Sequence, residues 1–189
     1  MEFQRKINAL WQAKAREEAQ IRYRYFKEMQ DLVVVRAAEI RKIEDFWPTT
    51  VQNHDGFRRL LTSRDLEVVQ AIEDLGVDEW QSETGIETVK LTLELGENPI
   101  VATTCLWVQV SLPTVTSSGL LFHSPHSLSW LEEDSSSFAQ TSFFRLFEST
   151  NTPLDSEERD GEAERVWELL QWVKTDLWED PLKYFELSK

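Results

Sequence analysis

Three histidines, His54, His123 and His126, are the side chains of this sequence best suited to metal binding or acid–base chemistry. His123 and His126 stand three residues apart in "HSPH", a spacing that places two ligands on one face of a helix. Pro125 between them disfavours a helix, and no cysteine stands nearby to complete a metal site. We therefore expect no metal and no cofactor.

His54 and Asp55 offer an adjacent imidazole and carboxylate. Adjacent side chains in a turn point apart, so a capping or turn hydrogen bond is the favoured role of His54. The sequence contains no glycine-rich phosphate loop and no GxSxG nucleophile elbow. We expect a protein without catalytic residues. A hydrolase that uses His54 or His123 is the enzyme alternative.

Acidic side chains are unevenly distributed along the chain. The 189 residues carry 34 Asp and Glu against 20 Lys and Arg, a formal net charge of −14. Residues 1–45 hold a net +2 and residues 46–189 a net −16. So acidic a domain should repel nucleic acid and attract basic proteins, with an association that weakens as salt rises. The alternative is that the charge serves solubility alone.

A long helix is predicted over residues 2–45, because this segment lacks Pro and Gly and is dominated by Ala, Gln, Glu, Lys and Arg. At about 1.5 Å per residue it would be roughly 60 Å long. Apolar residues recur along it at spacings of three and four and predict dimerisation with a second copy, as in a coiled coil. They are Phe3, Ile7, Leu10, Phe26, Met29, Val33 and Ile40. The alternative is an intramolecular hairpin or a helix that folds back on its own domain.

An antiparallel sheet is predicted in the middle of the chain. Residues 87–95 alternate apolar and polar side chains, residues 100–112 give the second arm of a hairpin, and residues 77–82 give an earlier strand. Before them, "TSRD" resembles a capping box and predicts a helix through Leu75. Short strands are also expected in "LLFH" and "SLSW".

Helical spacing returns after residue 162 and gives one apolar face. Its residues are Val166, Leu169, Leu170, Val173 and Leu177. The dipeptide Asp180-Pro181 should end this helix. The order of elements therefore predicts an α+β fold with helices segregated from an antiparallel sheet.

The third predicted strand has two further features. Cys105 is the single cysteine, so no internal disulfide is possible, and we expect it to be a small core residue. The run "PIVATTCLWVQV", residues 99–110, is unusually apolar. We expect part of this strand to be exposed and to dock another protein.

Four stretches together resemble the nucleosome assembly protein/SET family of histone chaperones. "FWPTTVQNH", residues 46–54, resembles the phenylalanine-tryptophan, threonine, asparagine-histidine signature of that family. "LELGENP" (93–99), "SFFRLF" (142–147) and "DLWEDPLKYF" (176–185) resemble three more of its motifs, in the same order. With the long first helix, these stretches cover nearly the whole chain.

The resemblance implies a homodimer in which residues 1–45 form the dimerisation helix and residues 46–189 form an acidic "earmuff" domain of antiparallel sheet covered by helices. It implies a nuclear protein, with or without shuttling to the cytoplasm, that binds core histones on a concave acidic surface for nucleosome assembly and disassembly. Direct contact with nucleic acid or membrane is not expected. Core or elbow positions would then be held by Phe46, Trp47, Phe143, Phe144, Trp178 and Tyr184.

Two other functions stay open on the sequence. Some short fungal relatives act as partners of a histone acetyltransferase, so this chain could be a scaffold that recruits a chromatin enzyme and touches histones weakly. It could also be a structural dimer whose acidity is incidental.

Histone-binding carboxylates are predicted after the last strand, before the final helix and at its end. They are Glu132, Glu133, Asp134, Asp155, Glu157, Glu158, Asp160, Asp176, Glu179 and Asp180. Each could equally be an ordinary solvated surface charge.

Overall fold

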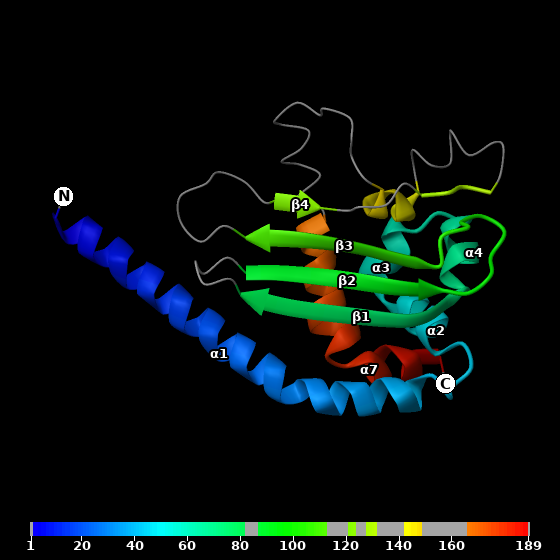
Figure 1. Ribbon diagram of the computed structural model, residues 1–189, viewed down its shortest axis with the longest axis horizontal. Coiled ribbons are helices and arrows are strands. Elements are labelled where there is room, and N and C mark those ends of the chain that lie inside the picture. Colours follow the sequence, from blue (N-terminus) through cyan, green and yellow to red (C-terminus); the bar gives the residue numbers. More distant parts are fainter. Residues whose placement is uncertain are drawn as a thin grey trace.

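Figure 1 shows the computed structural model of the chain. It describes residues 2–81, 87–112, 121–123, 128–131, 142–148 and 166–188. A four-stranded sheet lies over a layer of helices, and α1 runs along one edge and projects far beyond it at the N-terminus (Figure 1). No described helix is both long and apolar enough to cross a membrane.

Helix α1 spans Glu2–Ile40, so the long predicted helix is confirmed, although it ends before Asp45. Residues 41–45 form turns, and Asp45 has a left-handed φ of 53°, a conformation that Asp tolerates better than most residues. This turn leads directly into α2 (Phe46–Asn53). Pro48 lies in the first turn of α2, where its missing N–H costs no helical hydrogen bond.

Two short helices follow, α3 (Asp55–Leu60) and α4 (Asp65–Val69). His54 caps α3, because its Nδ1 accepts a hydrogen bond from the N–H of Phe57 at 3.2 Å, which confirms the capping role. The helix predicted through Leu75 is wrong beyond Val69. From position 72 onward the chain pairs with the next strand, with Leu75 and Val77 buried in the core, and this pairing outweighs the helical signal.

The sheet contains β1 (Ile72–Gln81), β2 (Glu87–Leu95), β3 (Cys105–Leu112) and β4 (Leu121–His123), all antiparallel in that order. The predicted strand over 87–95 is confirmed, β1 begins earlier than predicted, and β3 begins later. Trp130 of the predicted "SLSW" strand forms only an isolated bridge with Val101.

One face of the sheet is buried and the other is not covered by any helix in the described part of the chain (Figure 1). The buried side chains alternate along the strands as the sequence pattern predicts. Val77, Leu91 and Val108 lie level with one another on this face. The core therefore lies between the sheet and the helices.

Residues 99–110 are exposed only in part, and docking of another protein at their exposed side stays a prediction. Leu106, Val108 and Val110 are fully buried against the core, so the core explains the apolar character of the strand. Cys105 is exposed, which corrects its assignment to the core. It shares the outward face with Trp107, because β3 alternates its side chains between the two faces.

The final helical segment is α-helical over residues 166–172 and continues as the π-helical turn η2 (Val173–Trp178). It crosses behind the strands (Figure 1), and its predicted apolar face is confirmed, since all five residues are at most 1% exposed. Pro181 then starts α7 (Pro181–Phe185), which leads into η3 (Glu186–Ser188), so the break at Asp180-Pro181 is confirmed as well.

The "FWPTTVQNH" stretch forms a structural elbow. Phe46 stacks on Phe185 with ring centroids 4.7 Å apart, and Trp47 donates its indole N–H to Asp74 at 3.2 Å. The Asn53 side-chain amide donates to the carbonyl of Tyr184 at 2.8 Å. The motif therefore clamps α2 to the C-terminal segment and the first strand. The core and elbow roles expected for its aromatic residues are confirmed.

A buried carboxylate joins two other motifs. Asp65 is fully buried, and its Oδ2 accepts hydrogen bonds from the N–H and hydroxyl of Thr62 and from the N–H of Phe143. Its Oδ1 accepts a 2.5 Å hydrogen bond from Ser142, whose hydroxyl in turn caps η1 (Phe143–Phe147). Asp65 thus ties the "TSRD" segment to the "SFFRLF" segment.

Candidate functional site

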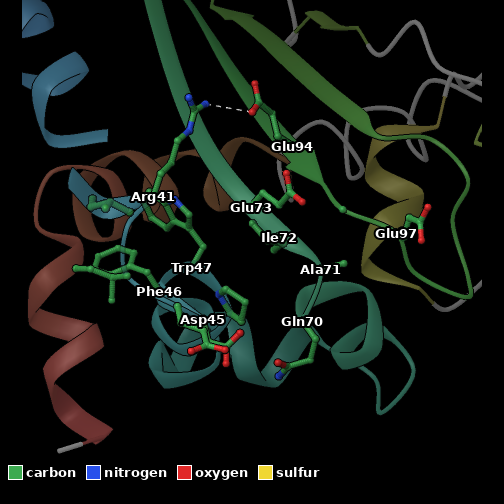
Figure 2. Close-up of a pocket in the computed structure, with 15 residues that line it drawn as sticks. Arg41, Asp45, Phe46, Trp47, Gln70, Ala71, Ile72, Glu73, Glu94 and Glu97 are labelled. Atoms are coloured by element: carbon green, nitrogen blue, oxygen red, sulfur yellow. Dashed lines mark hydrogen bonds and ion pairs between the residues drawn. The ribbon is translucent and has the colours of Figure 1, made fainter. Parts of the chain in front are cut away.

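An open recess of about 730 Å³ lies where the end of α1, the start of α2 and the ends of β1 and β2 meet. Figure 2 shows its lining, with Trp47 and Ile72 among the side chains around it and Glu73 and Glu94 on the strands. The elbow at Asp45 brings α2 back toward the sheet and so forms one wall.

Carboxylates dominate the polar lining of this recess. Five of them line it, all on exposed residues, whereas the lining contains a single basic side chain, Arg41. The five are Glu44, Asp45, Glu73, Glu94 and Glu97. We call them the recess carboxylates. Their mutual proximity produces a negative potential that attracts cations.

Arg41 is already engaged at the wall. Its Nη2 lies 2.6 Å from Asp74 Oδ2 and 3.2 Å from Glu94 Oε2 (Figure 2 draws the second contact). Asp74 is held by two further hydrogen bonds, from the Trp47 indole and the N–H of Leu75. Among the residues that the structure describes, none forms an ion pair with the other four recess carboxylates.

The turn after β2 positions two of these carboxylates. A Cβ at Gly96 would lie 2.6 Å from Glu73 Oε1, so glycine at this position leaves the space that the Glu73 carboxylate occupies. Asn98 accepts hydrogen bonds from the N–H groups of Ile100 and Val101 and so stabilises the turn that presents Glu97. The "GENP" part of the second motif, "LELGENP", therefore shapes this side of the recess.

The recess suits the cationic side chains of a basic polypeptide. Exposed carboxylates each contribute roughly 0–1 kcal/mol to an ion pair, so only several contacts together give useful affinity. The partly exposed side chain of Ile43 offers an apolar surface for the methylene groups of Lys or Arg. The described residues contain no group of three or more His, Cys, Asp or Glu that could hold a metal ion.

Only three of the predicted histone-binding carboxylates lie in described segments, and none of them lines the recess. Glu179 and Asp180 are exposed beside Arg36, which donates hydrogen bonds to the carbonyls of Trp178 at 2.5 Å and Glu179 at 3.1 Å. The others lie outside the described residues: Glu132, Glu133, Asp134, Asp155, Glu157, Glu158 and Asp160. His126 also lies outside them, and His123 ends β4.

Asp176 has a structural partner. Its Oδ2 lies 3.1 Å from Nε2 of the buried His54, and its Oδ1 accepts a hydrogen bond from Thr175 at 3.1 Å. Desolvation alone would raise the pKa of Asp176, but these hydrogen bonds and the nearby positive charge hold the pKa below its usual value. Asp176 therefore holds the His54 cap in place from the side of the final helix, and its predicted histone contact stays a prediction.

The structure divides the predicted dimerisation residues between two faces of α1. Phe26 and Ile40 are buried in this chain's own core and Val33 packs against it, and Phe26 stacks on Trp178 at 5.3 Å. The alternative of a helix that packs on its own domain therefore holds for these three. The remaining four residues are exposed: Phe3, Ile7, Leu10 and Met29.

A second apolar stripe runs along α1 on a different face. Each residue of a helix is rotated by about 100° from the one before it. By this rotation, the second stripe faces well away from the residues of α1 that pack against the domain. All its members are exposed large apolar side chains: Phe3, Ile7, Leu10, Ile21, Tyr25, Leu32 and Val35. We call this set the outer stripe. Spacings of three and four residues occur on both faces of α1. The sequence pattern therefore places residues of both faces in one dimerisation stripe.

Known structures share this fold over nearly the full chain. No family model matches the sequence, and no curated protein sequence matches it. Nucleosome assembly protein S from Plasmodium falciparum is 19% identical, with a TM-score of 0.65 over 97% of this chain and 96% of that chain. The Ccp1 structure is 16% identical, with a TM-score of 0.70 over 98% and 94%. The Vps75 structure is 15% identical, with a TM-score of 0.66 over 96% and 94%.

These likenesses show the fold. The chain has the nucleosome assembly protein fold, which confirms the architecture that the four sequence motifs predicted.

Proposed function

We propose that this chain is a histone chaperone that acts as a homodimer and holds basic histone segments at the recess between α1, α2 and the sheet. The observation that carries the proposal is the surplus of carboxylates there, five against one arginine that is already paired. The fold shared with nucleosome assembly proteins supports it.

Binding, rather than covalent chemistry, is the work that such a site supports. Core histones are strongly basic, and their contacts with DNA are driven by the phosphate charge. A set of weak carboxylate contacts can cover a histone surface and still release it to the denser charge of DNA. The affinity should fall with rising salt because the contacts are exposed to solvent.

The outer stripe supports the dimer. A helix that leaves seven large apolar side chains exposed on one face is stabilised when a second helix covers them. An antiparallel pairing with the same helix buries this face on both copies. Glu179 and Asp180 would add acidic surface beyond the recess. We propose that the protein is nuclear, where its histone ligands are. A histone acetyltransferase partner stays a prediction of the family resemblance.

Neutralising two recess carboxylates should weaken histone binding. For the double variant Glu73→Gln/Glu97→Gln we expect about 10-fold weaker binding to core histone complexes, since each contact contributes up to about 1 kcal/mol. Fluorescence titration at near-physiological salt measures this change.

The matched control is Glu168→Gln/Glu186→Gln, which removes the same charge from exposed positions outside the recess. We expect the control to bind histones almost as tightly as the natural chain. If both pairs weaken binding equally, net charge and not the recess governs the interaction.

A further inference from the structure

A second groove, of about 380 Å³, lies between α1 and the end of the final helix. Its apolar wall is formed by Ile21, Tyr25 and Met29 of α1 together with Trp178. At its base Lys174 and Glu79 form an ion pair at 2.6 Å, and both side chains are almost completely buried. We call it the α1 groove. It borders directly on the outer stripe, because Ile21 and Tyr25 belong to both.

The same helix carries Trp11, whose ring is contacted by Lys14 of its own helix, with Nζ 5.3 Å from the ring centroid. Trp11 is 63% exposed and belongs to the N-terminal third of α1. The N-terminal end of this helix projects beyond the domain (Figure 1). Within its own chain Trp11 cannot reach the part of the α1 groove at Met29, because Met29 is about 27 Å further along the same helix. A second copy is therefore needed to bring Trp11 to this part of the groove.

The pattern of α1 specifies how the second copy would lie. A two-fold axis near Ile21 places Leu10 beside Leu32 and Ile7 beside Val35 of the other antiparallel helix. The same register places Lys14 beside Glu28, so charges of opposite sign also meet. Apolar and charged positions therefore agree on one register.

This register brings Trp11 to the α1 groove. Trp11 and Met29 are about five full turns apart, so they project from the same flank of α1. A two-fold axis perpendicular to an antiparallel pair keeps that flank on one side for both helices. Trp11 of one copy thus comes level with the neighbourhood of Met29 in the other, on the side where the groove opens.

We propose that, in the homodimer proposed above, Trp11 of each protomer inserts into the α1 groove of the other. The indole covers the apolar wall and shields the Lys174–Glu79 ion pair from water. Each domain is then held by the helix of its partner as well as by its own.

Thiol cross-linking tests the placement. In a Cys105→Ser background, chains carrying Trp11→Cys are mixed with chains carrying Met29→Cys, and a short bis-maleimide is added. We expect a covalent dimer in high yield, with the 11–29 link confirmed by peptide mass spectrometry. Mixing Trp11→Cys with Val34→Cys is the control, because Val34 is exposed on the opposite side of α1 and should give little product.

The single variant Trp11→Ala gives an independent readout. Because Trp11 is exposed in the protomer, this change should leave the domain folded and raise the dissociation constant of the dimer about 10- to 100-fold. A stable dimer without the 11–29 link overturns the groove inference alone. A chain that stays monomeric overturns the dimer as well, and histone binding measured on the same sample shows whether the chaperone function fails with it.

Discussion

The double variant Ile21→Glu/Leu32→Glu should be monomeric at concentrations where the natural chain is a dimer. Both residues belong to the outer stripe and are 51% and 71% exposed in the protomer. Dimerisation would bury two carboxylates per chain against an apolar partner, at a cost of several kcal/mol. We therefore expect the dissociation constant to rise at least about 1,000-fold. Light scattering coupled to size exclusion measures the mass.

The matched control is Gln20→Glu/Val34→Glu, which adds the same two charges to exposed positions of α1 that face away from the outer stripe. We expect this variant to remain a dimer. A monomeric control would show that negative charge on α1 is sufficient to separate the chains. An Ile21→Glu/Leu32→Glu variant that is still dimeric would show that the outer stripe is not the interface.

Asp65→Asn should destabilise the domain by about 3 kcal/mol, which lowers the melting temperature by roughly 10 °C. Asp65 accepts hydrogen bonds from four donor groups in a fully buried position. An asparagine amide can accept at only one atom, and its NH₂ group would face N–H and O–H donors. Urea unfolding followed by circular dichroism measures the change.

Asp55→Asn is the control for this variant, because Asp55 is exposed in the first turn of α3. Its effect should be no more than about 0.5 kcal/mol. If Asp65→Asn unfolds at the same urea concentration as the natural chain, the four donors find other partners. The hydrogen bonds by which Asp65 joins α4 to η1 would then contribute nothing to the stability of the domain.

The regular elements could be predicted from the sequence because each has a strong periodic signal. The alternation in β2 and the apolar face of residues 166–177 were confirmed, and so was the long helix. The start of β1 was missed because a capping signal at Asp65 precedes it and favours a longer helix. Only pairing with β2, a contact distant in sequence, decides that residue 72 belongs to a strand.

The candidate site was harder to predict, because it depends on the path of the chain. The recess carboxylates come from three separate segments that the elbow at Asp45 and the turn at Gly96 bring together. Each is an ordinary acidic residue in its own segment. The structural contact of Asp176 with the buried His54 could not be predicted from the acidic motif either, because the two residues are 122 positions apart. Histone binding by Asp176 stays a prediction.

Competition between histone binding and DNA tests the central claim most directly. The natural chain is mixed with purified core histone complexes and duplex DNA at near-physiological salt, and soluble complexes and aggregates are measured as salt is raised. We predict tight binding that prevents histone–DNA aggregation and weakens with salt. A folded dimer that neither binds histones nor prevents aggregation would contradict the chaperone function proposed for this chain.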